Sequence, residues 1–172
     1  MSVYNNCLDK QQRKLLHEWL IAVRTAGMSH HEAEIYYSRM NKILGIPVII
    51  VTTAVGTTVF SSISSSPKIY IQIIVGLCSM LAAILASLQT FLGYSSLSEK
   101  HQMAGDRYNT LRRDIESILA KSESEKVDFG KFSDLFLSNW SEIEKDTPSI
   151  PHKIQDQALD RIRKLVDIPL AA

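Results

Sequence analysis

Two long uncharged stretches dominate the pattern of hydrophobic and polar positions along this chain. Residues 44–64 and residues 69–92 contain no Asp, Glu, Lys, Arg or His. At ~1.5 Å per helical residue the first spans about 31 Å and the second about 36 Å, close to the hydrocarbon thickness of a bilayer. Buried helices of soluble bundles usually have shorter apolar runs and a polar face. The pattern therefore predicts two transmembrane helices, of which the second is the more apolar because Gly45, Pro47 and Gly56 dilute the first.

Residues 65–68 alone separate the two stretches, so we expect a tight turn between antiparallel neighbours, which together make a transmembrane hairpin. Basic side chains are concentrated beyond the other ends of the two spans. They are Arg24, Arg39, Lys42, Lys100, Arg107, Arg112 and Arg113. Because basic residues favour the cytosolic side, we expect a multi-pass protein of the inner (plasma) membrane with both termini in the cytosol. No long apolar run precedes Leu44, so no cleavable signal peptide is expected.

Amphipathic patterns precede the first span. One helix is expected to end near Gly27, and a second to begin at a capping box formed by Ser29 and Glu32 and to run into the membrane. Pro47 would either kink the second helix or mark a new first turn. The apolar face of the first helix is outlined by Leu8, Gln12, Leu16, Trp19, Leu20 and Val23, and that of the second by Ala33, Tyr37, Met40 and Leu44.

A heptad pattern follows the second span over residues 93–121, where seam positions alternate at spacings of four and three. The seam runs through Leu97, His101, Ala104, Tyr108, Leu111, Ile115 and Ile118. It predicts a cytosolic helical stalk that extends the hairpin, with His101, Ala104, Tyr108 and Leu111 at its centre.

Residues 128–168 predict two terminal amphipathic helices, the first capped by Asp128 and separated from the second by Pro148 and Pro151. The first carries an aromatic stripe of Phe129, Phe132, Phe136, Trp140 and Ile143, and the second carries Ile154, Ala158, Ile162 and Leu165. Such stripes are more often bundle core than binding site.

The whole chain, residues 1–172, is expected to form a single all-α membrane protein, because no run of glycine, proline or charge divides it. Its 19 Lys and Arg nearly balance its 18 Asp and Glu, so no bulk attraction to nucleic acid is expected. Cys7 lies in a polar segment and Cys78 in the second span, which argues against a disulfide.

Hydroxyl side chains form a stripe along the first span. Thr53, Thr57, Ser61 and Ser64 share one helical face. Such a stripe can line an aqueous pore if several copies assemble around an axis. It can equally serve close helix packing, with each hydroxyl bonded to a carbonyl one turn earlier. Both interpretations remain open at this point.

The second span carries small residues on one face, Gly76, Ser79, Ala83 and Ser87, which predicts a helix-packing surface. Gln72 and Gln89, one towards each end of this span, are expected to reach interfacial water. Neither span contains an ionisable Asp, Glu, Lys, Arg or His, which argues against a proton relay or an ion-coupled carrier.

His30, His31 and Glu34 are close enough in sequence to suggest a metal site. However, they form no HExxH pattern and no paired cysteine accompanies them, so a solvated helix start is the expected role. The chain shows no phosphate-binding glycine loop, nucleophile elbow or carboxylate pair. We therefore expect no enzyme activity, cofactor or metal.

Residues 29–121 resemble the SLATT family, the two-transmembrane effector domains that associate with SMODS and SLOG components of bacterial nucleotide signalling. The resembling positions are Tyr36, Tyr37, Arg39 and Asn41; Gly45-Ile46-Pro47; Gly56-Thr57-Thr58 with Phe60; Leu85 to Phe91 with Gln89; and His101, Ala104, Tyr108, Leu111 and Arg112. The resemblance implies a homo-oligomeric, pore-forming effector of antiviral defence, activated by a sensor. Because no sensor domain is recognisable here, the trigger would be a separate protein or a ligand of the terminal helices.

Two hypotheses follow for the function. The first is an ion channel or pore, formed by several copies in membrane lipid, that depolarises the membrane. The second is a non-conducting scaffold, in which the hairpin anchors cytosolic helices that recruit a partner.

Overall fold

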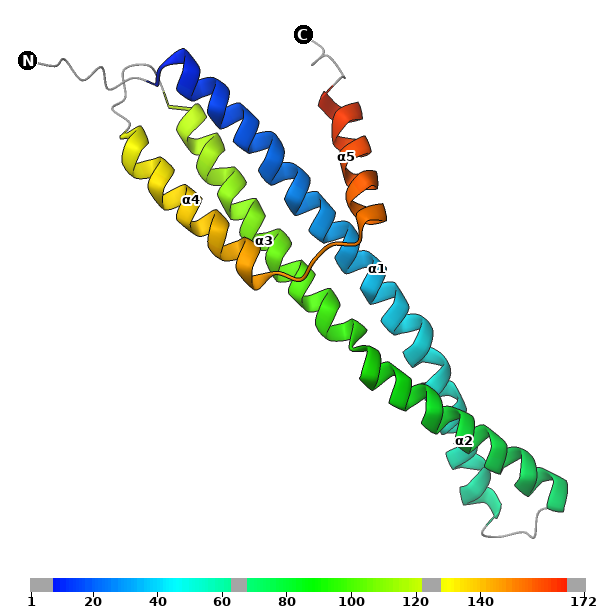
Figure 1. Cartoon of the computed structure of the whole chain (residues 1–172). Coiled ribbons are helices and arrows are strands. Elements are labelled where there is room, and N and C mark those ends of the chain that lie inside the picture. Colours follow the sequence, from blue (N-terminus) through cyan, green and yellow to red (C-terminus); the bar gives the residue numbers. More distant parts are fainter. Residues whose placement is uncertain (1–7, 63–67, 122–127, 167–172) are drawn as a thin grey trace, which may run out of the picture. The chain divides into compact units, whose positions relative to one another are not determined.

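The computed structural model describes residues 8–62, 68–121 and 128–166. Within these ranges every regular element is an α-helix, as the sequence predicts (Figure 1). The helices are α1 (Lys10–Ser62), α2 (Ile69–Leu92), α3 (Tyr94–Leu119), α4 (Phe129–Asp146) and α5 (His152–Val166). The chain divides into two compact units: unit 1 comprises Met1–Glu34 and Glu99–Ala172, and unit 2 comprises Ile35–Ser98. Helices α1 and α3 contribute residues to both.

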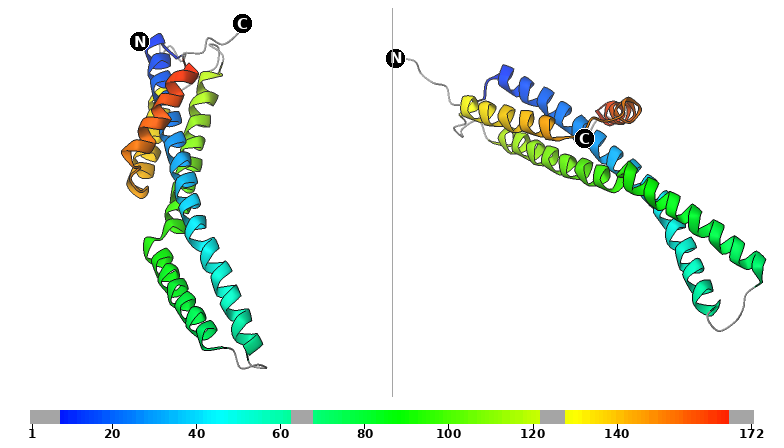
Figure 2. Two further views of the ribbon diagram at one scale, coloured as in Figure 1. Left: turned by 90° about the vertical axis from the view of Figure 1, so that its right-hand side faces the viewer. Right: turned by 60° about the horizontal axis from the view of Figure 1, so that its bottom comes forward.

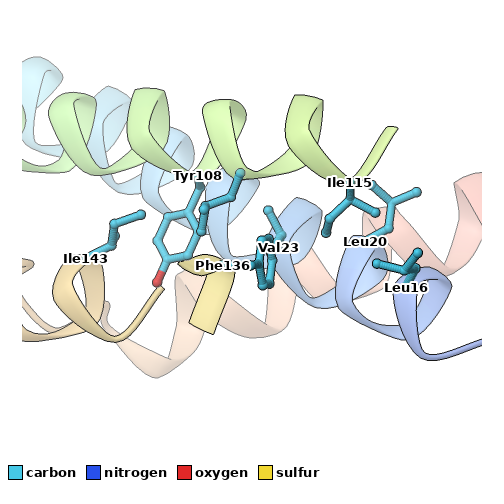
Figure 3. Packing of buried hydrophobic residues seen from close by; sticks show 8 residues of the cluster. Leu16, Leu20, Val23, Tyr108, Ile115, Phe136 and Ile143 are labelled. Atoms are coloured by element: carbon cyan, nitrogen blue, oxygen red, sulfur yellow. The ribbon is translucent and has the colours of Figure 1, made fainter. Parts of the chain in front are cut away.

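Unit 1 is built on three helices that pack side by side, α1, α3 and α4 (Figures 1 and 3). In their shared core, Tyr108, Leu111 and Ile115 of the α3 seam and Phe136 and Ile143 of the α4 stripe turn inward. Trp19 of α1 stacks on Phe136 of α4, with ring centroids 5.0 Å apart. The core consists of Leu16, Leu20, Val23, Tyr108, Leu111, Ile115, Phe136 and Ile143.

The start of α4 and the break between α4 and α5 lie where the sequence predicts them. The side chain of Asp128 caps α4 by accepting a hydrogen bond from the Lys131 amide, at 3.0 Å. Proline then separates the helices, since α4 ends at Asp146 and α5 begins directly after Pro151. Helix α5 buries Ile154, Ala158 and Ile162. The predicted Leu165 lies outside the described side chains.

Helix α1 is continuous from Lys10 to Ser62, so the predicted boundary between Gly27 and Ser29 is wrong. Ser29 does not cap a helix. Its hydroxyl donates to the carbonyl of Thr25 at 2.8 Å, and the residue is 1% exposed. Pro47 also lies inside the helix, which excludes the alternative of a new first turn.

Unit 2 contains the two apolar stretches, and both are long and apolar enough to cross a membrane. The most apolar stretch of α1 buries none of its residues, and that of α2 buries 6%. A core helix of a soluble protein would be mostly buried. The last part of α1 and α2 run antiparallel in this unit, because Tyr37 meets Tyr94 while Asn41 meets Gln89 (Figure 2).

Gly93 ends α2 in the left-handed conformation, with φ of 59°. A residue with a Cβ atom is strained there, whereas glycine is not. The Gly93 amide donates to the Gln89 carbonyl at 3.3 Å and so satisfies one of the last carbonyls of the helix. The turn between α1 and α2 lies outside the described residues except for Lys68.

Candidate functional site

The hydroxyl stripe of α1 lies on the surface of unit 2. Thr53, Thr57 and Ser61 are exposed, and Ser64 lies outside the described residues. The residues of α1 that are half-buried against α2 include Val51, Val55, Thr58 and Ser62. At 100° per residue these positions lie on the opposite side of the helix from Thr53. The stripe therefore points away from α2 and does not serve the packing between the two helices of one chain.

The three described hydroxyls of the stripe are bonded within their own helix. Thr53 donates to the Ile49 carbonyl at 2.7 Å, Thr57 to the Thr53 carbonyl at 3.0 Å, and Ser61 to the Thr58 carbonyl at 3.0 Å. Such bonds reduce the cost of placing a hydroxyl in an apolar medium, because the donor is satisfied. The hydroxyl oxygens of Thr53 and Thr57 can also accept a hydrogen bond from water. The stripe is thus compatible with both lipid and a water-filled path.

The small face of α2 makes no contact of the predicted kind with α1. Gly76, Ser79, Ala83 and Ser87 are all exposed, and the buried position of α2 is the neighbouring Ala82, which is 3% exposed. The hydroxyls of Ser79 and Ser87 donate to the carbonyls of Val75 and Ala83, each at 2.8 Å. A role of this face in packing against another copy stays a prediction.

A polar contact joins α1 to α2 at one end of unit 2. The Gln89 Nε2 atom donates to Asn41 Oδ1 at 3.2 Å. Gly45 permits this approach, since a Cβ atom at that position would lie 2.9 Å from the same nitrogen. Gln89 therefore links the two helices. The sequence predicts contact with interfacial water for this side chain and does not predict Asn41 as its partner. Gln72, which was expected to reach interfacial water, is exposed.

Unit 1 contains a buried histidine pair between α1 and α3. His30 is 4% exposed and His101 is 0% exposed. Their Nδ1 atoms lie 2.9 Å apart, so one ring donates a hydrogen bond and the other accepts it. The ring of His30 also stacks on Tyr108, with centroids 5.5 Å apart.

Burial, and then the charge of His101, lower the pKa of His30 to about 4. Burial also lowers the pKa of His101. The pair is therefore neutral near pH 7 and forms a polar link inside the bundle. The expectation of a solvated helix start is wrong for His30. His31 is exposed, as expected, and places Nδ1 3.6 Å from Glu34 Oε2, but it too lies inside α1 and not at a helix start.

The four central seam residues of α3 all lie in the interior of unit 1. His101, Ala104, Tyr108 and Leu111 are each at most 4% exposed. Burial, with the negative charge of Glu144, raises the pKa of the Tyr108 hydroxyl. Over the described residues, no group of three or more His, Cys, Asp or Glu side chains is arranged to hold a metal ion.

Two arginines of unit 1 share one carboxylate. Arg24 Nη2 lies 2.7 Å from Glu116 Oε1, and Arg112 Nη1 lies 3.4 Å from the same oxygen. The hydrogen bond from Arg24 lowers the pKa of Glu116 most, and the charges of Arg112 and Arg113 add to it. Glu116 is thus held ionised between two guanidinium groups.

No protein-family model, curated protein or solved structure matches this chain.

Proposed function

We propose that unit 2 is a transmembrane hairpin and that copies of the chain assemble into a pore that depolarises the membrane. The observation that carries the membrane part is the uncovered apolar surface of α1 and α2. Phe60 and Phe91 are 78% and 86% exposed, and Ile49 and Ile73 are 65% and 58% exposed. Each Leu, Ile, Val or Phe favours the membrane centre over water by about 0.3–0.6 kcal/mol. Lipid is the solvent that suits such a surface.

The pore itself is supported by the position of the hydroxyl stripe. One hairpin cannot enclose a channel, so any aqueous path needs several copies. Because Thr53, Thr57 and Ser61 point away from α2, a ring of chains can turn α1 inward and leave α2 towards lipid. In such a ring the small face of α2, with Ser79 and Ala83, is available for contact between neighbouring copies.

The same sector of α1 changes character along the helix. One turn and two turns before Thr53 it carries Ile49 and Ile46, which are 65% and 54% exposed. A pore lined by this face would be polar towards Lys68 and apolar towards the predicted cytosolic side. Apolar constrictions close pores by excluding water. The Ile46 and Ile49 level is therefore the proposed gate, and the termini are proposed to lie in the cytosol beyond it.

The setting is proposed from the SLATT resemblance: an effector of prokaryotic antiviral defence in the inner membrane, triggered by a sensor. The chain needs no catalytic residue for this role. Opening of the pore would dissipate the membrane potential and stop growth.

Expression in bacteria with a potential-sensitive dye tests the proposal. The wild-type chain is expected to depolarise the cells, and Thr57→Leu to abolish the effect because it makes the stripe apolar. Thr90→Leu is the matched control: it replaces another exposed threonine, on α2, and should leave depolarisation intact. Unchanged potential with full membrane insertion of the wild type contradicts the pore and leaves the scaffold hypothesis. Full activity of Thr57→Leu contradicts the assignment of the lining.

A further inference from the structure

Unit 1 contains a pocket between α1, α3 and α5, with a volume of about 380 Å³. Its floor is formed where α1 approaches α3 closely. At Gly27, a Cβ atom would lie only 3.3 Å from the Cβ atom of Tyr108. Ile162 of α5 forms part of the wall. The volume falls in the range of small-molecule sites, at its lower end.

Helix α5 is fixed over this pocket by both apolar and charged contacts. Ile154, Ala158 and Ile162 are at most 8% exposed, and Arg161 forms an ion pair with Glu32 of α1. The wall that α5 supplies is therefore part of the packed unit. A ligand in the pocket would contact α5 together with α1 and α3.

The charge around the pocket is positive. Arg24 and Arg112 line it, and its described lining contains no Asp or Glu. The nearest carboxylate that pairs with the arginines is Glu116, and one of its oxygens serves both of them. A guanidinium group has five N–H donors, so this single acceptor leaves most of them available.

Arg112 shows the deficit most directly. Its Nε atom is buried, and no acceptor for it occurs in the part of the chain that the structure describes. That atom is closed to solvent, but the Arg112 side chain as a whole is 34% exposed, so its other N–H groups are the donors offered to an anion in the pocket. Asn109 adds an amide group to the same rim.

The lining also includes three apolar side chains, those of Val23, Met28 and Ile162. An inorganic anion gains no binding free energy from these apolar side chains, whereas an anion with a hydrophobic body buries apolar area against them. The two arginines and the apolar side chains together favour a ligand with a charged head and an apolar body.

We propose that this pocket binds a small organic anion, with Arg24 and Arg112 holding its charged group and Val23, Met28 and Ile162 contacting its apolar part. The site is independent of the proposed pore, because every residue of it lies in unit 1. It adjoins the buried histidine pair, because Tyr108 lines the pocket and its ring stacks on His30.

Calorimetric titration of the full chain in a neutral detergent tests the site. Naphthalene-2-sulfonate is the probe. Inorganic phosphate keeps only the negative charge, and uncharged 2-naphthol keeps only the apolar rings. The sulfonate is expected to bind with a stoichiometry of one per chain, and each partial probe to bind at least about tenfold more weakly. If phosphate or naphthol binds as tightly as the sulfonate does, a site that recognises both a charged and an apolar group is contradicted.

Variants separate the site from general attraction to cations or micelles. Arg112→Met is expected to weaken sulfonate binding at least about tenfold, because it removes the charge and keeps the length of the side chain. Arg113→Met, the exposed neighbour that does not line the pocket, should bind as the wild type does. Arg24→Met provides a second test, since its side chain is 50% exposed and its loss should not prevent folding. Unchanged binding by both pocket variants, or an equal loss with Arg113→Met, overturns the proposal.

Discussion

Acidification from pH 7 to pH 4 is expected to destabilise unit 1 through His30. The pKa of this side chain falls from 6.5 to about 4 on folding. Above pH 6.5 His30 is neutral in both the folded and the unfolded chain, so the lowered pKa does not change the free energy of unfolding. As the pH falls below 6.5 the unfolded chain binds the proton first, and stability decreases until the folded chain is also protonated near pH 4. The full loss is about 3 kcal/mol.

Tryptophan fluorescence offers a selective assay for this loss. The sequence contains two tryptophans. Both lie in unit 1, where Trp19 stacks on Phe136 at 5.0 Å and Trp140 meets the same ring at 5.6 Å. Urea unfolding followed by this signal in detergent micelles, at a series of pH values, therefore reports on the bundle and not on unit 2.

A pair of variants isolates the contribution of His30 from that of the carboxylates. His30→Gln keeps a hydrogen-bonding group opposite His101 but cannot take up a proton, so its loss of stability between pH 6.5 and pH 4 should be smaller than that of the wild type by about 3 kcal/mol. His17→Gln, an exposed substitution on the same helix, should follow the wild type. Equal pH dependence of His30→Gln and the wild type would refute the reasoning.

Three further substitutions test the packing and the proposed pore. Ile115→Ala, at a side chain with 0% exposure, should lower the free energy of unfolding of unit 1 by about 2–5 kcal/mol in the same fluorescence assay, and a loss below about 1 kcal/mol would contradict the core assignment. Gly45→Ala should raise the thermal stability measured by circular dichroism in a Gln89→Ala background, through helix propensity, and raise it less in the wild type, where the new Cβ displaces Gln89; equal changes in both backgrounds would contradict the clash. Ile49→Thr should increase dye-reported depolarisation by hydrating the proposed gate, and an unchanged response would place the gate elsewhere.

The continuity of α1 could have been predicted from the sequence. Leu16, Leu20, Val23, Gly27 and His30 recur at spacings of four and three, which is one heptad seam through the supposed boundary. Gly27 taken alone indicates a helix end, whereas this periodicity indicates one continuous helix. A single glycine inside a helix costs only about 1 kcal/mol, and here it allows the close approach to Tyr108.

The polar contacts were harder to predict, because each joins residues far apart in the chain. His30 and His101 are separated by 71 positions, and Asn41 and Gln89 by 48. A single histidine or glutamine on a helix face looks like an ordinary polar residue until the packing of two helices is known. By contrast, the cap at Asp128 depends on neighbours three residues away, so the local sequence was sufficient.

The hydroxyl stripe lies between these two cases. Helical periodicity correctly places Thr53 and Thr57 on one exposed face, since a shared face needs only a regular helix. What that face contacts depends on other molecules, and neither the pattern nor the fold of one chain determines it.

Thiol labelling of Cys78 tests the membrane insertion of unit 2 most directly. The sequence contains two cysteines, so Cys7→Ser leaves Cys78, near the middle of α2, as the sole target. In intact vesicles a water-soluble maleimide should leave Cys78 unmodified, because lipid excludes the reagent. Dissolving the vesicles in denaturing detergent should make Cys78 react rapidly. Equally rapid labelling in intact vesicles would contradict the membrane hairpin.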